Sequence, residues 1–190
     1  MIAMAPGAHL TTPLVLICTG ILLLFDLLLA LLAWRFVRRK EMQQMRRLLI
    51  ATSGVFFLLV WTSVMIWGWD WFYSYIFPGW ARYLLPPLFG LGYTVFAMGM
   101  SWLCMKLPGN PAILWCLLGG LEGLLSHIYA IYGLGAASKP PIMQGTDPLA
   151  TLIFAIFEKA FYWSLILFAS KLIWQRVEPG SGSLHELKST

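Results

Sequence analysis

The chain has 190 residues and a formal net charge of +5. Hydrophobic residues make up 59% of the chain and charged residues 11%. Soluble domains carry about 25% charged residues, so this composition excludes an ordinary water-soluble globular protein. We therefore expect a protein whose main solvent is lipid.

Five long apolar segments follow one another along the chain. They are residues 13–34, 48–68, 84–104, 111–134 and 149–170. A helix rises ~1.5 Å per residue and the hydrocarbon core is ~30 Å thick, so about 20 residues span it. Backbone amides must be paired in lipid, which makes each segment a helix. The sequence thus predicts an all-α, polytopic bundle of five transmembrane spans over residues 1–178, followed by a flexible tail over 179–190.

Basic residues between the first two apolar segments predict the orientation of the bundle. This short segment, interpreted as a loop, contains Arg35, Arg38, Arg39, Lys40, Arg46 and Arg47. Short loops rich in Lys and Arg stay in the cytoplasm. We predict an N-terminus outside, an outer 69–83 loop and a cytoplasmic C-terminus, in a bacterial inner membrane or a plasma membrane. Because these basic residues are not spread over a helix face, we expect no nucleic-acid partner.

The sequence lacks several motifs that are typical of soluble enzymes or of metal sites. Cys18, Cys104 and Cys116 show no CxxC or Cys/His spacing, so we interpret them as packing residues and expect no metal and no cofactor. The chain also has no GxSxG, no HExxH and no phosphate-binding glycine loop, so hydrolase and nucleotide-driven chemistry lack support.

Very few ionisable side chains lie inside the predicted spans. They are Asp26, Glu122, His127, Glu158 and Lys159. A charge at the bilayer centre costs ~2.5–3.5 kcal/mol, so each of them needs a partner or a role. Their positions along the spans put the three carboxyls within roughly 6 Å of one level. We therefore predict one polar cluster near the middle of the membrane.

The fourth predicted span carries two stripes of residues that share a helix face. Gly119, Gly123 and His127 form one stripe, and glycines so spaced let a second helix approach closely. We therefore predict that Gly119 and Gly123 pack against the fifth span. The neighbouring stripe and the facing residues complete a predicted ligand-binding set of Asp26, Glu122, Ser126, His127, Tyr129, Glu158, Lys159 and Tyr162.

Several interpretations of this cluster stay open. In one, Lys159 neutralises Glu122 or Asp26 and His127 bonds Glu158, which only locks the helices in register. The leading functional hypothesis is an integral membrane protein that binds a small or lipidic ligand or acts as a membrane subunit. An alternative is a membrane-embedded enzyme, a proton-shuttling isomerase of lipids, with Glu122, His127 and Glu158 as candidate catalytic groups. A second alternative is a proton-coupled transporter. For any of these roles we expect the lipid bilayer as a partner, and a homo-oligomer or a larger membrane complex as the assembly.

The layout has one family resemblance. Five spans with acidic and histidine side chains near the middle, and an aromatic last span after Asp147-Pro148, resemble emopamil-binding, sterol-isomerase-like membrane proteins. In that family a carboxyl/His set moves a proton on a lipid. The resemblance is one of layout, and it assigns no role to any single residue of this chain.

Overall fold

The computed structural model describes residues 11–72, 81–133 and 145–178. These residues form α1 (Thr12–Phe36), α2 (Arg39–Phe72), α3 (Ala81–Lys106), α4 (Pro111–His127), the π-helical turn η1 (Ile128–Gly133) and α5 (Pro148–Val177). Within these ranges there is no strand, so the predicted all-α class is confirmed. The predicted tail at 179–190 lies outside the described residues.

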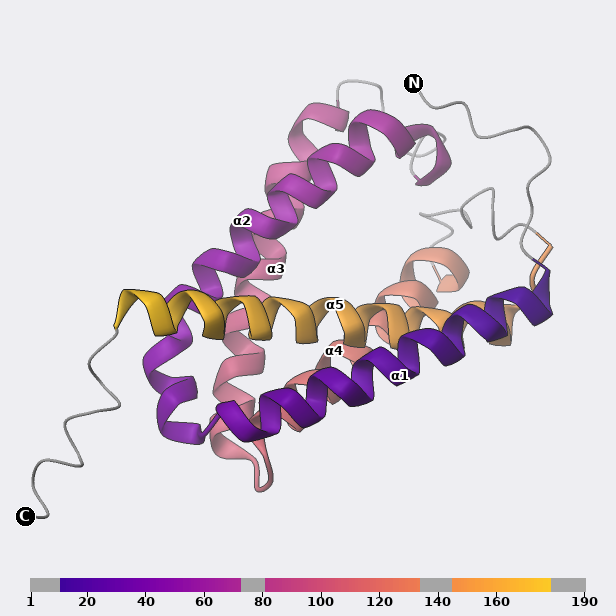
Figure 1. Ribbon diagram of the computed structural model, residues 1–190. Coiled ribbons are helices and arrows are strands. Elements are labelled where there is room, and N and C mark those ends of the chain that lie inside the picture. Colours follow the sequence, from indigo (N-terminus) through magenta and orange to yellow (C-terminus); the bar gives the residue numbers. More distant parts are fainter. Residues whose placement is uncertain (1–10, 73–80, 134–144, 179–190) are drawn as a thin grey trace, which may run out of the picture.

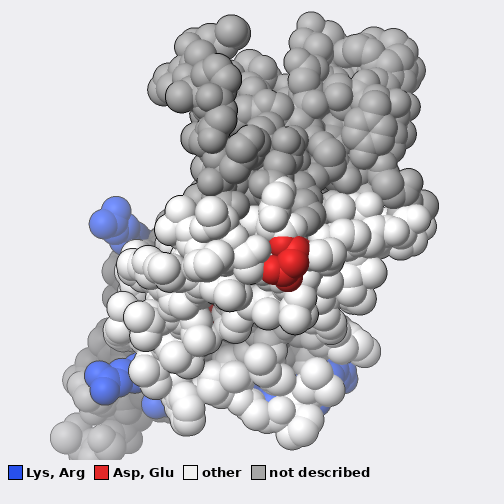
Figure 2. All heavy atoms as spheres, turned by 90° about the vertical axis from the view of Figure 1, so that its right-hand side faces the viewer, with Lys and Arg blue, Asp and Glu red and all other residues white. Residues whose placement is uncertain are grey.

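Helices that could cross a bilayer make up most of the described chain. By length and composition they are Thr12–Phe36, Pro87–Lys106, Pro111–Gly133 and Pro148–Val177. They match the first, third, fourth and fifth predicted spans, which supports a membrane protein. The second predicted span, 48–68, lies inside the long helix α2 but is not among these four. On the face shown in Figure 2, acidic and basic side chains cover only small parts of the described surface.

The helices form two groups. Helices α1, α4 and α5 lie side by side, with α5 in contact with both of the others (Figure 1). Helices α2 and α3 pair with one another, cross α5 towards its C-terminal end and then diverge from the first group. The junction between the groups is filled by large side chains, of which Phe57, Trp115 and Trp163 are fully buried. The indole of Trp115 donates a hydrogen bond of 2.8 Å to the carbonyl oxygen of Trp163, which ties α4 to α5.

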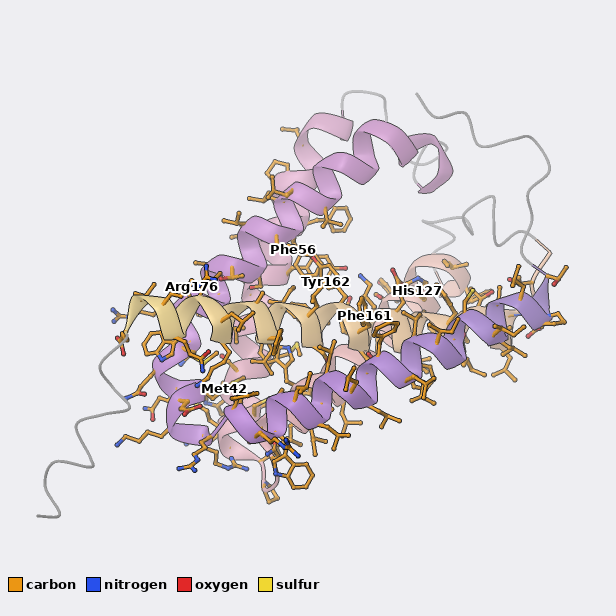
Figure 3. All side chains as sticks on the ribbon, viewed as in Figure 1. Met42, Phe56, His127, Phe161, Tyr162 and Arg176 are labelled. Atoms are coloured by element: carbon orange, nitrogen blue, oxygen red, sulfur yellow. The ribbon has the colours of Figure 1, made fainter. Side chains whose placement is uncertain are left out.

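The basic segment between the first two predicted spans is not the loop that the sequence suggested. Only Val37 and Arg38 lie outside the helices there, and the remaining basic residues belong to the ends of α1 and α2. The physical reason is an apolar stripe on the first turns of α2. Met42, Met45 and Leu49 recur at helical spacing and are fully buried, so these turns pack into the bundle (Figure 3).

Arg39 joins the start of α2 to the turn between α3 and α4. Its guanidinium donates to the carbonyl oxygens of Cys104 at 3.0 Å, Met105 at 2.7 Å and Gly109 at 2.7 Å, and also to that of Leu107. The last carbonyls of a helix have no partner within the helix, so the side chain of Arg39 satisfies the C-terminus of α3. The α1–α2 and α3–α4 connections therefore lie at the same end of the bundle.

Replacement of Arg39 by Lys is expected to lower the free energy of unfolding by about 2 kcal/mol, because an ammonium cannot reproduce the forked contacts of a guanidinium. The matched control is Arg38→Lys, at an exposed position one residue away. Unfolding in mixed detergent micelles measures both. Equal stability of the two variants would contradict the role given to Arg39.

The opposite end of α5 is capped by Asp147. Its carboxylate accepts a hydrogen bond of 2.8 Å from the backbone amide of Ala150, as an N-cap residue does. The hydrogen bond from Ala150 holds the pKa of this carboxyl below its ordinary value. The backbone amide of Asp147 also donates to the hydroxyl of Thr12 at 3.4 Å, so α1 and α5 begin side by side.

Candidate functional site

Close packing of α4 on α5 creates the setting for the polar residues. A Cβ atom added to Gly119 would lie 2.8 Å from the Cβ atom of Trp163, and one added to Gly123 would overlap the carbonyl oxygen of Ala155. Only glycine leaves room for this approach, which brings the two backbones together. The structure thus places both predicted packing glycines against α5.

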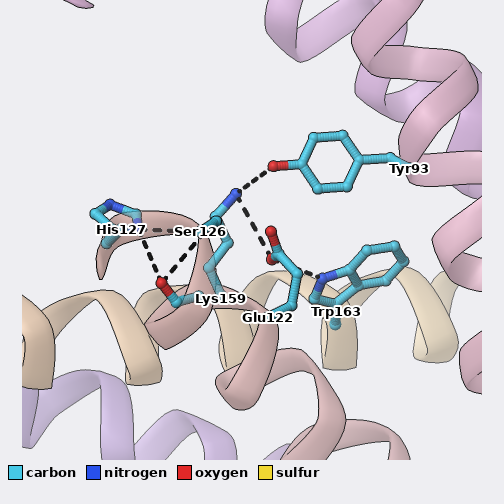
Figure 4. Close-up of polar contacts among 7 residues, drawn as sticks. Tyr93, Glu122, Ser126, His127, Lys159 and Trp163 are labelled. Carbon is cyan, nitrogen blue, oxygen red and sulfur yellow. Dashed lines mark hydrogen bonds and ion pairs between the residues drawn. The ribbon is translucent and has the colours of Figure 1, made fainter. Parts of the chain in front are cut away.

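Glu122 of α4 and Lys159 of α5 form an ion pair across this contact. Lys159 Nζ lies 4.0 Å from Glu122 Oε2, and the two side chains are 12% and 9% exposed. The same ammonium donates to the hydroxyl of Tyr93 in α3 at 3.2 Å. The indole N–H of Trp163 donates to Glu122 Oε2 at 3.4 Å. Figure 4 shows that this set joins three helices through polar contacts.

Aromatic rings surround the ammonium of Lys159. It lies 5.1 Å from the ring centroid of Tyr93 and 5.8 Å from those of Phe57 and Tyr162. The rings of Phe57 and Tyr93 are stacked at 3.6 Å, and Tyr162 meets Phe57 edge-on at 4.6 Å. A cation near aromatic faces is stabilised by the ring quadrupoles, most strongly where water is excluded. We call Phe57, Tyr93, Glu122, Lys159, Tyr162 and Trp163 the ionic–aromatic cluster.

His127 closes α4 next to this cluster. Its Nδ1 lies 2.9 Å from the carbonyl oxygen of Gly123, and since a carbonyl only accepts, Nδ1 carries a proton. Ser126 donates to the same carbonyl at 3.2 Å. His127 also interacts electrostatically with Glu158, Lys159 and Glu122. The π-helical η1 follows directly, and such turns are frequent at functional sites.

Asp26 does not join the other ionisable residues, although the sequence predicted a single cluster. It is 4% exposed and lines a cavity between α1, α4 and α5, together with Cys116, Gly120 and Ala160. Glu122, His127, Glu158 and Lys159 are not part of that lining. The described polar residues are therefore divided between two places.

Two tyrosines of the predicted set differ in their surroundings. Tyr129 lies on η1 and is 64% exposed, so the structure does not bring it into the cluster. Tyr162 points towards Phe56 of α2, with ring centroids 5.1 Å apart (Figure 3).

Three members of the cluster were not predicted from the sequence, namely Tyr93, Phe57 and Trp163. An aromatic residue inside an apolar segment has the same pattern as an ordinary core residue. The signal that could have found Trp163 is its spacing of four from Lys159, which puts both on one face of α5.

Metal ligands do not gather in the described part of the chain. No three His, Cys, Asp or Glu side chains lie close enough there to hold a metal ion. Cys18, Cys104 and Cys116 are free thiols. The described side chains of the site are carboxylates, an ammonium, an imidazole and aromatic rings.

Comparison of the chain with protein-family models, with curated proteins and with solved structures finds no match.

Proposed function

We propose that this chain is an integral membrane protein that binds a small or lipidic ligand at the ionic–aromatic cluster. The observation that carries the proposal is the long distance between the charged atoms of Glu122 and Lys159. The charged atoms are 4.0 Å apart, whereas Lys171 and Glu41, at the end of the bundle, meet at 2.8 Å. Charge-assisted hydrogen bonds normally measure about 2.7–2.9 Å, so at 4.0 Å the two charged groups are not directly hydrogen-bonded. One ligand oxygen beside the pair can lie within hydrogen-bond distance of both.

The surroundings of the pair indicate the chemistry of the ligand. A polar group that both donates and accepts, such as a hydroxyl, can donate to the Glu122 carboxylate and accept from the Lys159 ammonium. An apolar body would contact the faces of Tyr93 and Tyr162, which lie beside the ammonium. A lipid with a neutral, hydroxyl-bearing head combines both properties.

The test compares lipid binding by the full chain and by Tyr93→Phe. This substitution removes the hydroxyl that accepts from Lys159 and keeps the ring. Lipids that co-purify with the protein in detergent are identified by native mass spectrometry and returned to delipidated protein. We expect the wild type to be stabilised and Tyr93→Phe to lose most of that gain. The matched control is Tyr132→Phe, an exposed tyrosine of η1. Equal stabilisation of all three proteins would contradict the proposal.

The hydrogen bonding of His127 favours a second candidate, the proton-shuttling isomerase. Because Nδ1 donates to Gly123, Nε2 of the neutral ring is free to act as a base. Enzymatic activity predicts that deuterium from heavy water enters a bound lipid, and that His127→Gln abolishes the exchange while lipid binding persists. Binding without exchange in the wild type would leave only the first candidate.

We further propose five spans with the N-terminus outside. Support comes from the contacts that gather the basic residues at one end, where Arg39 contacts the α3–α4 turn and Lys171 pairs with Glu41. In a protein without native cysteines, Gln43→Cys should be shielded from a membrane-impermeant maleimide added to intact cells, and Thr11→Cys should react. Both positions are exposed in the structure. Labelling of Gln43→Cys from outside would show that the orientation is the reverse of the one proposed.

A further inference from the structure

A cavity of about 260 Å³ lies between α1, α4 and α5, apart from the ionic–aromatic cluster. Its walls are leucine, isoleucine, alanine and phenylalanine side chains, with Gly120 and Ala160 at the α4–α5 contact. Several wall residues face outward, because Leu27 is 53%, Leu117 64% and Leu121 47% exposed. In a bilayer this side of the cavity opens to the acyl chains.

One carboxyl lies in this apolar cavity. Asp26 is only 4% exposed, and within the described residues neither carboxyl oxygen has a hydrogen-bond partner. A carboxylate at membrane depth is costly without a partner, and such residues mark functional positions. A ligand that enters the cavity can supply the partner that the described residues do not.

We propose that the cavity is a second binding site, which takes a lipophilic amine from the bilayer and pairs its ammonium with Asp26. The proposal does not depend on the function proposed for the ionic–aromatic cluster. An ammonium supplies both the opposite charge and the N–H donor that a buried carboxylate requires. A cavity of ~150 Å³ holds benzene, so 260 Å³ holds roughly ten non-hydrogen atoms.

The shape of the site restricts the ligand further. The walls offer almost no other polar group besides the thiol of Cys116, so the rest of the molecule must be apolar. A short alkyl chain on a tertiary amine meets these requirements. A neutral alcohol of the same size is the alternative occupant, because a protonated carboxyl could donate to it.

The experiment uses the full chain in lipid nanodiscs with dicyclohexylcarbodiimide. This reagent partitions into lipid. A carboxylic acid adds across one C=N bond to give an O-acylisourea, whose acyl group then migrates from oxygen to nitrogen to give a stable N-acylurea, so no group leaves. Mass spectrometry of the peptide that contains Asp26 measures the labelling rate. The probes are N,N-dimethyloctylamine and 1-decanol, which have the same number of non-hydrogen atoms. A tertiary amine cannot form an amide with the activated carboxyl. Decanol could form a decyl ester there with release of dicyclohexylurea, and the mass of the peptide distinguishes this ester from unreacted, protected Asp26.

We expect Asp26 to be labelled and N,N-dimethyloctylamine at about ten times its Kd to slow the reaction about ten-fold. 1-Decanol should leave the rate nearly unchanged. The amine should also raise the melting temperature of the wild type and of Glu122→Gln, but not that of Asp26→Asn. Retention of the shift in Glu122→Gln separates this site from the ionic–aromatic cluster.

Three results would overturn the proposal. Asp26 could resist the carbodiimide, which would show that the cavity is closed to lipid. Decanol could protect as well as the amine, which would show that charge is not recognised. The thermal shift could persist in Asp26→Asn, which would place the amine elsewhere. The protection assay needs only the wild type, so the first two results do not depend on folding of a variant.

Discussion

Replacement of Lys159 by Met is expected to lower the free energy of unfolding by about 3–5 kcal/mol. The methionine keeps most of the apolar stem, so packing among the aromatic rings changes little. What changes is charge, because Glu122 is 9% exposed and Lys159 is the cation that pairs with it. A carboxylate left in the middle of the bundle loses its counter-ion where no water can replace it.

The partner substitution makes this expectation specific. Glu122→Gln removes the negative charge and keeps the shape, so Glu122→Gln/Lys159→Met should recover most of the lost stability. A double-mutant cycle from unfolding in mixed micelles gives the coupling between the two residues, which we expect to be about 2 kcal/mol or more.

A matched control separates the pair from a general effect of lysine removal. Lys106→Met removes an exposed lysine at the end of α3 and should change stability by less than about 0.5 kcal/mol. Should Lys159→Met unfold no more easily than Lys106→Met, the two residues would not form an ion pair.

The helices could be predicted from the sequence where the apolar segments are long and uninterrupted. Helices α1, α3 and α5 contain the predicted segments, and α4 with η1 covers the fourth as far as Gly133, because a span must be helical whatever its neighbours are. The start of α2 could not be predicted in the same way. Charge suggested a loop, whereas burial of Met42 and Met45 extends the helix through the basic residues.

The position of Asp26 shows what a linear sequence leaves open. Counting residues gives the height of a side chain in the membrane, and by height Asp26 belongs with Glu122. The direction around the helix axis depends on which helices α1 contacts. In the structure α1 packs along α5 and meets α4, so Asp26 faces the cavity and not the cluster. Spacing along the chain contains no information about that choice of neighbours.

The partners of Lys159 could not be predicted from the sequence, for a different reason. Tyr93 and Phe57 belong to α3 and α2, and their contact with α5 follows from the crossing of the two helix groups. The glycines of α4 were easier to interpret, because close approach requires the same residue type wherever the partner helix is.

Substitution of Gly123 by Leu is expected to separate α4 from α5 and to destabilise the protein by about 3 kcal/mol or more. Even the first added carbon would lie 2.6 Å from Cγ of Lys159, and it would overlap the carbonyl oxygen of Ala155. A flexible side chain can move aside, but a helix backbone can yield only by moving the helix. The substitution therefore acts on packing and on the position of the Lys159 ammonium together.

The control is Gly99→Leu on α3, because a Cβ atom there meets nothing within 4 Å. We expect Gly99→Leu to melt near the wild type in detergent and Gly123→Leu to melt far below it. Gly123→Ala should fall between them, since it adds the clashing carbon without the bulk of leucine. Displacement of Lys159 should also reduce lipid binding by Gly123→Ala, at temperatures where that variant is still folded. If Gly123→Leu and Gly99→Leu had the same melting temperature, the glycine face of α4 would be exposed to lipid. Neither the close contact of α4 with α5 nor the ion pair that depends on it would then exist.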